Sequence, residues 1–549
     1  MKRLLGVCFF LLLVKVVPAD QHKYFIGFAD KSGSAFTTSN PSEFLSPRAI
    51  QRRLFQNISY SEQDLPVNQN YIDSVVAKGA TVFTKSKWFN GITILCDSSI
   101  LPDILSLPFV ISSVKVFREA KPKVKKNITS GVPLNNNSEL KITGEDYGMS
   151  FNQIHLMNGE AMHEEGFLGD GKLIAVLDDG FYAVDRLSPF DRLRARHNIV
   201  ATWDFVSNNS SVYDDDTHGM SVLSTIAGYV PGMLIGTAPN ASFLLLRSED
   251  AATENIIEEY NWNAAAEYAD SAGADLITTS LGYTEFDDST ANHVYSDMDG
   301  DHCPSSIAAD IAASKGMLVV ASAGNSGVSP WHFIGAPSDG DSVISVAAVD
   351  SMGRHIYFSS YGPAPDGRIK PNVAAKGYNS TLSDASGAIT SGSGTSFSCP
   401  ILAGAAACLW QAYSRASAMQ IKMAIERSGS LYSTPNDSMG YGIPDFRTAG
   451  YFLTYGTTET PITDQLISVF PNPFSDDVSI KFYSEYAQFI SIEIFNSTGQ
   501  LISSQKGKTL DHTIHNFTSN SIVNASAGLY IVKVTTKDNS FVKKVLKKS

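Results

Sequence analysis

Four residues in this chain belong to the types that cleave amide bonds, and each stands at the end of an apolar or small-residue segment. Asp178 ends the apolar run 172–178, and Asn325 follows a second apolar run. His218 and Ser396 each open a segment of small residues. Because a serine hydroxyl is a weak nucleophile, it needs a base within hydrogen-bond reach, and an imidazole base needs a carboxylate to hold its tautomer. The order Asp, His, Asn, Ser therefore predicts a site for acyl transfer.

The segment around Ser396 favours a nucleophile at the N-terminus of a helix. Backbone N–H groups at such a position point at the negative charge that develops on a substrate carbonyl oxygen. Gly392 and Gly394 are expected to leave room for a substrate backbone beside the serine. Pro400 is expected within the first turn of the helix, where a missing N–H costs no hydrogen bond.

The region from about 150 to 450 contains the elements that must position these residues. Short apolar runs alternate there with longer segments of helical character. This alternation predicts an α/β core in which helices cover both faces of a parallel sheet, giving three layers. The predicted strands are 172–178, 241–247, 274–280, 316–323 and 342–350.

Different patterns flank this core. Strand-like and helical runs mix in residues 20–126 and predict a small α+β domain. Residues 127–149 have little periodicity and are interpreted as a linker and maturation junction. We place the core domain at 150–455. Alternation of period two in 465–549 predicts an all-β, sandwich-like module.

Residues 1–19 have the features of a secretory signal peptide. Lys2 and Arg3 give a basic start, Leu4–Val14 is apolar, and Val17-Pro18-Ala19 is a small-residue cleavage site. Eleven apolar residues are too few to cross a bilayer as a helix, which takes about 20. The protein is therefore expected to be exported.

Charge excludes one class of function and divides the chain. The 549 residues carry a net charge of −13, whereas a nucleic-acid-binding protein needs a basic surface. Residues 20–126 carry +5, residues 127–464 carry −24 and residues 465–549 carry +3. A basic N-terminal domain beside an acidic core is consistent with electrostatic complementarity within one precursor, although a solvated acidic surface also explains the charge.

Few cysteines are present, and Cys8 leaves with the signal peptide. The others are Cys96, Cys303, Cys399 and Cys408, too few for a disulfide scaffold and spaced unlike any zinc cluster. Cys399 and Cys408 fall on one predicted helix, about 13 Å apart, too far to form a disulfide. Pairing of Cys303 with one of them and buried free thiols both stay open.

The motifs around these residues resemble the subtilisin-like serine proteases, the subtilases, over about residues 150–450. The resemblance rests on Gly394–Pro400, on His218-Gly219 with the small residues after it, and on 358–377. It implies that Asp178 orients the imidazole and that His218 is the general base and then the general acid. Ser396 would be the nucleophile, and the Asn325 amide and the Ser396 N–H would bind the oxyanion.

The same resemblance implies a substrate-binding edge and shows two departures. Ser280, Leu281 and Gly282 match the edge strand that pairs with a substrate backbone, and Ala323 and Gly324 would also contact substrate. A glycine-rich wall at this edge permits a large apolar substrate side chain before the scissile bond. Asp179 stands where the family more often has Ser or Thr, and Met220 where a small polar residue is commoner. Neither replaces a triad member.

Both flanking domains also resemble known parts. Residues 20–126 resemble a subtilase pro-segment, which assists folding and blocks the cleft. The tail resembles the C-terminal sorting domain of the type IX secretion system of Bacteroidota, through Phe470–Phe474, Gly528–Tyr530 and the basic end Lys543–Lys548. Without that resemblance, the pattern of the tail would be interpreted as a β-sandwich that binds a ligand or cell wall.

We therefore expect a secreted serine endopeptidase, made as an inhibited precursor in a Gram-negative host. It would pass the periplasm, engage the outer-membrane secretion machinery, and end secreted or attached to the outer surface. Its partners would be protein or peptide substrates and its own pro-segment, and we expect a monomer. The alternative is a catalytically silent cell-surface binding protein on the same fold.

No cofactor is expected for the chemistry, and structural Ca²⁺ is a weaker hypothesis. Asp214–Asp216 and the trio Asp297, Asp299 and Asp301 concentrate the oxygen ligands that Ca²⁺ prefers. Neither follows the spacing of a twelve-residue calcium loop. We favour solvated acidic loops as the explanation of both.

Overall fold

The computed structural model describes residues 21–117, 146–455, 467–470, 473–475, 478–484, 489–509, 513–519, 525–537 and 540–548. The signal peptide and most of the junction 127–149 lie outside these ranges. The chain divides into two compact units, Met1–Arg447 and Thr448–Ser549, and each is described by itself. Within the described ranges, no helix combines the length and the apolar character needed to cross a membrane.

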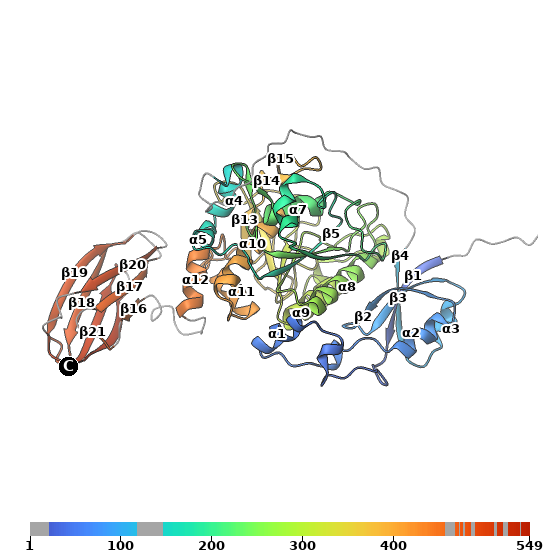
Figure 1. Cartoon of the computed structure of the whole chain (residues 1–549), viewed down its shortest axis with the longest axis horizontal. Helices are drawn as coiled ribbons and strands as arrows, with labels where there is room; N and C mark the ends of the chain where they lie inside the picture. The colour runs from blue at the N-terminus through green and yellow to red at the C-terminus, as the bar shows by residue number, and fades with distance from the viewer. Residues whose placement is uncertain are drawn as a thin grey trace, which may run out of the picture. The chain divides into compact units, whose positions relative to one another are not determined.

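A seven-stranded sheet forms the centre of the first unit (Figure 1). Its order is β13-β12-β11-β10-β5-β9-β6, and every neighbouring pair is parallel. This confirms the predicted parallel sheet. The strands are β5 (Leu173–Asp178), β6 (Ile199–Asp204), β9 (Ser242–Arg247), β10 (Leu276–Thr279), β11 (Leu318–Ser322), β12 (Ile344–Val349) and β13 (Val373–Lys376).

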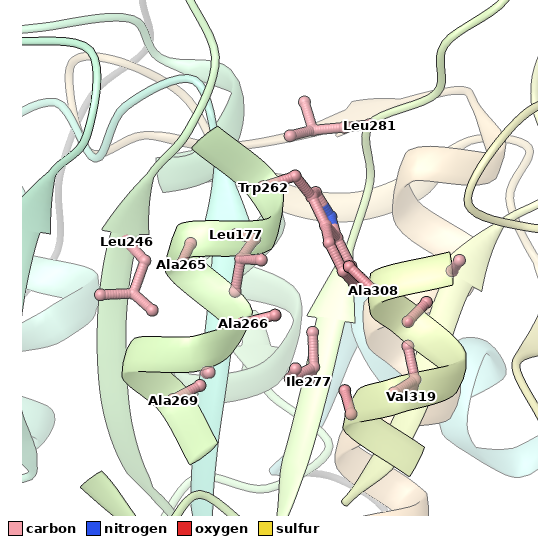
Figure 2. Packing of buried hydrophobic residues seen from close by; sticks show 14 of the residues in the cluster. Leu177, Leu246, Trp262, Ala265, Ala266, Ala269, Ile277, Leu281, Ala308 and Val319 are labelled. Atoms are coloured by element: carbon pink, nitrogen blue, oxygen red, sulfur yellow. The ribbon is translucent and has the colours of Figure 1, made fainter. Parts of the chain in front are cut away.

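Helices cover both faces of this sheet. On one face, α8 (Ile257–Ala272) and α9 (Pro304–Ser314) pack against the strands, while α7 (His218–Ala227) and α10 (Thr395–Ala412) contact them from the other face. Alanines of α8 let the helix lie close to the strands, and Trp262 of α8 reaches toward Ala308 of α9 (Figure 2). The buried strand residues explain the continuous apolar runs of the sequence.

The first unit contains further, shorter elements. They are α4 (Phe151–His155), α5 (Glu160–Glu164), α6 (Asp191–Ala195), β7 (Tyr229–Val230), β8 (Leu234–Ile235), β14 (Ser380–Ser383), β15 (Ile389–Gly392) and α11 (Ala418–Arg427). The helix α12 (Phe446–Tyr455) spans the division between the units.

The N-terminal part of the first unit is an α+β domain, as predicted. Its four-stranded antiparallel sheet has the order β2-β3-β1-β4 and its own hydrophobic core. The elements are β1 (Gln21–Phe28), α1 (Pro47–Phe55), α2 (Gln69–Val76), β2 (Thr81–Ser86), β3 (Gly91–Asp97), α3 (Leu101–Leu105) and β4 (Val110–Phe117).

A buried ion cluster joins this domain to α8. The fully buried Asp270 accepts hydrogen bonds from Arg52 (2.6 Å), Arg53 (2.8 Å) and Lys87 (2.8 Å). Burial alone would raise the pKa of Asp270, but Lys87 and the two arginines outweigh it and hold the pKa below its ordinary value. Loss of either side of such a cluster leaves an uncompensated buried charge, which costs about 3–5 kcal/mol.

A second carboxylate of α8 binds the same domain. Glu267 accepts hydrogen bonds from the Ser86 hydroxyl (2.7 Å) and from the backbone N–H groups of Lys87 (2.7 Å) and Trp88 (3.0 Å). The outer face of α8 is therefore the acidic surface on which the basic N-terminal domain docks.

The second unit contains two antiparallel sheets around one core, which confirms the predicted all-β architecture. Their orders are β16-β17-β20 and β19-β18-β21-β22. Phe474 and Tyr530, from the motifs singled out in the sequence, are buried in this core. The strands are β16 (Ile467–Phe470), β17 (Val478–Ser484), β18 (Phe489–Asn496), β19 (Leu501–Lys508), β20 (Thr513–Ser519), β21 (Gly528–Thr535) and β22 (Ser540–Lys547).

Candidate active site

Asp178 and His218 are in direct contact at the carboxyl edge of the sheet. Asp178 is the last residue of β5 and is fully buried, and His218 is the first residue of α7. The imidazole Nδ1 lies 2.7 Å from Asp178 Oδ1. The His218 side chain is 32% exposed, so its ring links a buried carboxylate to solvent.

Gly219 makes this contact possible. A Cβ on Gly219 would lie 2.4 Å from the carbonyl oxygen of Gly180 and 2.7 Å from Cβ of Asp178. Distances this short exclude any side chain, so only glycine lets α7 begin against the end of β5. The glycine of the His218-Gly219 pair is therefore required for steric reasons.

A second carboxylate adds to the charge beside the imidazole. Burial alone lowers the pKa of His218, but the attraction and hydrogen bond of Asp178, with the charges of Asp179 and Asp216, raise the pKa to about 9. Burial and the neighbouring Asp178 raise the pKa of Asp179 above its ordinary value. Asp179 Oδ1 also accepts a hydrogen bond from the Gly219 N–H, at 3.3 Å. Asp179 therefore faces the site. Together these charges favour the imidazolium over the neutral ring up to about pH 9.

Ser396 is the second residue of α10, and its carbonyl oxygen is held by Ser280. The expectation that Pro400 falls within the first turn is wrong, because the helix begins at Thr395 and Pro400 is inside it. Pro400 has no N–H to donate to the carbonyl four residues earlier, which is that of Ser396. The Ser280 hydroxyl donates to that carbonyl instead, at 2.9 Å. Because Pro400 leaves the Ser396 carbonyl without a helical donor, this carbonyl can accept from Ser280, which ties Ser396 to the segment after β10.

Asn325 is held at the start of α10 through its amide oxygen. Its Oδ1 accepts hydrogen bonds from the N–H (2.9 Å) and the hydroxyl (3.0 Å) of Thr395. A Cβ on Gly394 would lie 3.6 Å from Asn325 Nδ2, 3.7 Å from the Ser396 nitrogen and 3.8 Å from Asn325 Oδ1, which is already bonded to Thr395. Both donors therefore border the space that Gly394 leaves open, which suits an oxyanion. Gly392 was expected to leave room for a substrate backbone, but the space beside it is filled by protein, because a Cβ there would lie 2.8 Å from the Phe397 ring.

A pocket of about 160 Å³ adjoins Ser396. Of the predicted substrate-binding residues, Ser280, Gly282 and Gly324 line it. Leu281 packs in the core near Trp262 (Figure 2), and Ala323 is fully buried. Successive residues of an extended chain point to opposite sides, so the side chains of Leu281 and Ala323 face away from the pocket.

Several pocket residues were missed in the sequence. They are Thr284, Ser326, Trp331, Phe333, Gly335 and Ser360. The aromatic pair Trp331 and Phe333, between two Ser- and Gly-rich segments, was the one available signal. Sequence spacing alone does not indicate that this pair faces Ser396. The two rings add an apolar wall to an otherwise small and polar pocket.

A larger cavity of about 690 Å³ lies away from this chemistry. It is lined by the N-terminal domain, by α8 and by β6 with the residues after it, and Phe83, Trp203 and Tyr268 are among its residues. None of the candidate catalytic residues lines it. Ser396 and Asn325 line only the smaller pocket among those described, so the smaller one is the candidate substrate site.

Four of the six acidic residues considered for Ca²⁺ bind neighbouring protein groups. Asp215 pairs with Arg247 at 3.2 Å, and Asp216 accepts a hydrogen bond from the Thr217 N–H at 2.6 Å. Asp297 accepts from the Val294 N–H at 2.9 Å, and Asp299 pairs with His302 at 2.8 Å. Cys96, Cys303, Cys399 and Cys408 are all free and buried, which decides the open question of Cys303 pairing.

Comparisons with known proteins identify the chain. Profiles of the subtilase family match residues 169–442, those of the Bacteroidota peptidase S8 propeptide domain match 23–130, and those of the secretion system C-terminal sorting domain match 468–548. Subtilisin DY of Bacillus licheniformis is 32% identical over 298 residues, covering 53% of this chain and 93% of that protein. The chain belongs to the subtilase family.

Two further relatives support this assignment. Thermitase of Thermoactinomyces vulgaris is 30% identical over 48% of the chain and 83% of its own length. A thermostable alkaline protease of Halalkalibacterium halodurans is 25% identical over 62% of the chain and 82% of its own length. This subtilase is a serine endopeptidase made as a precursor, and its type IX sorting domain implies secretion or attachment to the outer surface.

Proposed function

We propose that this subtilase cleaves peptide bonds with Ser396 as nucleophile, His218 as proton carrier and Asp178 as the group that orients the imidazole. The observation that carries the proposal is the 2.7 Å contact between His218 and Asp178 at the sheet edge where α10 presents Ser396. The His218 ring lies 6.2 Å, centroid to centroid, from Phe397, the residue after the nucleophile.

The reaction proceeds through an acyl-enzyme. Ser396 Oγ attacks the scissile carbonyl carbon while His218 takes the hydroxyl proton, and Asp178 stabilises the imidazolium that forms. The carbonyl oxygen becomes an oxyanion that accepts hydrogen bonds from Asn325 Nδ2 and the Ser396 N–H. His218 then gives its proton to the leaving amine, and water releases the acyl group by the same steps.

The substrate side chain before the scissile bond enters the pocket beside Ser396. Ser280, Gly282 and Gly324 form its polar and glycine-rich side, and Trp331 and Phe333 its aromatic side. At about 160 Å³ the pocket accepts a single side chain of apolar character. No cofactor takes part in these steps, and bound Ca²⁺ would have only a structural role.

Residues 20–126 act as the intramolecular inhibitor until the junction 127–149 is cut. The ion cluster around Asp270 and the contacts of Glu267 support this role, because they bind the pro-segment to α8 independently of the cleft. The boundaries 150–455 for the catalytic domain and 465–549 for the sorting domain complete the proposal. Removal of the signal peptide 1–19 sends the precursor through the periplasm to the outer-membrane machinery.

The test is the intact mass of the purified precursor beside its Ser396→Ala variant, both produced without residues 1–19. Wild type is expected to lose about 100–130 N-terminal residues, and the variant is expected to keep them, because the cut at the junction needs the Ser396 hydroxyl. Labelling of Ser396 by an active-site serine probe provides a second readout.

If both proteins keep the full N-terminus, the test moves to peptide cleavage after limited removal of the pro-segment. Activity that depends on Ser396 then supports the proposal with maturation by another protease. Absence of both cleavage and labelling would favour the alternative, a catalytically silent surface protein that keeps the subtilase fold.

A further inference from the structure

Glu259, His293 and Cys303 form a cluster outside the active site. Glu259 is in α8, His293 is in the connection between β10 and α9, and Cys303 is the residue before α9. One ligand atom from each lies within 4.8 Å of those of the other two. Imidazole Nε2 of His293 is 3.1 Å from Glu259 Oε2.

Neighbouring groups contact all three side chains, and the Cys303 thiol donates to the Asp297 carbonyl oxygen at 3.5 Å. The Ser305 hydroxyl donates to Glu259 Oε1 at 2.7 Å, which leaves Oε2 facing the histidine. Asp297 Oδ2 lies 4.0 Å from Nδ1 of His293, the ring nitrogen that points away from Glu259. A carboxylate on the far side of the ring and a hydroxyl on the second carboxylate oxygen are the outer contacts that usually support metal ligands.

The donors are enclosed and of mixed chemical type. The side chain of Glu259 is 0% exposed, that of His293 is 11% exposed, and Cys303 is fully buried. Oxygen, imidazole nitrogen and thiolate sulfur together are the donor set of Zn²⁺, whereas Ca²⁺ and Mg²⁺ take oxygen alone. This distinguishes the cluster from the acidic loops of the same domain.

We propose that Glu259, His293 and Cys303 bind one Zn²⁺ ion, with a fourth position open to water. Tetrahedral bonds of about 2.0–2.3 Å place the donor atoms roughly 3.3–3.8 Å apart. The Glu259–His293 contact, at 3.1 Å, needs to lengthen by only about 0.2 Å, and the sulfur needs to approach by about 1 Å. Binding converts the Cys303 thiol to a thiolate, whose proton goes to solvent with any proton on His293.

The metal fixes the segment that closes the substrate pocket. Tyr295, two residues after His293, stacks on Phe333 with 4.0 Å between ring centroids, and its hydroxyl donates to the Pro363 carbonyl at 2.8 Å. Phe333 lines the pocket beside Ser396. A Zn²⁺ ion joining this segment to α8 therefore supports the aromatic wall from behind without touching the substrate.

The experiment uses the precursor from residue 20 onward with Ser396→Ala, so that self-cleavage and catalysis do not enter the result. After chelator treatment and its removal, the protein is titrated with Co²⁺ alone. We expect one equivalent to bind, with the intense visible bands of four-coordinate cobalt and a near-ultraviolet thiolate-to-cobalt band. One equivalent of Zn²⁺ should abolish both.

Variants assign the ligands. Cys303→Ser should lose the thiolate band, and Glu259→Gln and His293→Gln should lose the four-coordinate spectrum. Ser305→Ala, which removes an outer contact, should weaken Co²⁺ binding about 10–100-fold. Near-ultraviolet circular dichroism checks that each variant is folded, and Glu259→Gln keeps the thiol if Cys303→Ser is unstable.

Cys408→Ala is the matched control, because Cys408 is also a buried thiol beside a histidine, with Sγ 3.8 Å from His163 Nε2. It should keep both bands. The cluster of Asp178, Asp179 and His218 has no thiol, so cobalt bound there lacks the thiolate band. No thiolate band in the parent protein, or a band that survives Cys303→Ser in folded protein, would overturn the proposal.

Discussion

Two histidine–carboxylate pairs on the same domain are surrounded differently. His218 contacts Asp178 at 2.7 Å, and His293 contacts Glu259 at 3.1 Å. In both pairs burial alone lowers the pKa of the imidazole, and the neighbouring carboxylate outweighs it and raises the pKa. The histidine of the first pair is 32% exposed, and that of the second is 11% exposed.

The third group of each site explains why similar pairs suit different tasks. Beside the first pair, Ser396 lines an open pocket, so a substrate can reach the hydroxyl and protons can move through the ring. Beside the second, Cys303 is fully buried, so a thiol there meets no substrate but can complete a ligand set. Access to the third group, more than the pair itself, thus separates catalysis from metal binding.

The largest expected effect is the loss of kcat when the Asp178–His218 pair is changed, compared with the same change in a histidine–carboxylate pair outside the site. Asp178→Asn should lower kcat about 10⁴-fold, because the amide favours the wrong imidazole tautomer and does not stabilise the imidazolium. Glu160→Gln is the matched control, since Glu160 forms a histidine–carboxylate pair with His155 at 2.6 Å and neither residue lines the pocket beside Ser396. Its kcat should stay within about twofold, because this pair does not touch the reacting groups. Equal losses in mature enzyme on a peptide substrate would contradict the assignment.

The next effect concerns the oxyanion donors. Asn325→Ala should lower kcat about 10²–10³-fold with little change in KM, because the lost hydrogen bond acts mainly on the transition state. Steady-state kinetics of the mature enzyme measure both constants. A rise in KM at unchanged kcat would instead mean that Asn325 binds the ground state of the substrate.

A smaller effect tests the second pair by stability. In the Ser396→Ala precursor, Zn²⁺ at about 100 times its Kd should stabilise the fold by about 2.7 kcal/mol, which raises Tm by roughly 5 °C. With Glu259→Gln this increase should disappear, and with Asp178→Asn it should remain. Scanning calorimetry with and without Zn²⁺ measures the difference. Loss of the increase in Asp178→Asn alone would place the metal in the catalytic cluster.

The smallest effect concerns the pH dependence of the first pair. Because the neutral imidazole accepts the serine proton, kcat/KM should rise with pH through a midpoint displaced above the ordinary 6.5 toward about 9. Asp179→Asn should move this midpoint down, since the charge of Asp179 contributes to the raised pKa of His218. A pH profile of kcat/KM for both proteins checks this, and an unchanged midpoint would remove Asp179 from the electrostatics of the site.

The same shift has a consequence for stability. The pKa of His218 in the folded protein lies above its unfolded value, so the pair with Asp178 stabilises the fold fully below about pH 6.5. This contribution is lost as pH rises through about 9. The enzyme therefore gains activity over the range in which this pair ceases to stabilise it.

Local patterns in the sequence were enough to predict the parallel core and the character of the two flanking domains, and they also named four candidate catalytic residues, whose roles stay a prediction. Buried strands of a parallel sheet are apolar throughout, so β5 and β11 were visible as runs, and Asp178 and Asn325 stood out as the polar residues after them. His218 and Ser396 stood out because each lies in the first turn of a helix rich in small residues, and at Gly219 the close approach of Gly180 and Asp178 permits no side chain.

Only the tertiary structure decided which distant segments meet. The direction of Leu281 into the core, the Ser280 hydroxyl on the Ser396 carbonyl, and the aromatic wall of the pocket all depend on contacts between separate loops. Cysteine spacing indicated no zinc cluster, yet folding brings Cys303 beside a histidine and a glutamate from other elements. Periodicity reports which face of an element is buried, whereas the partner on that face is chosen by the packing of the whole domain.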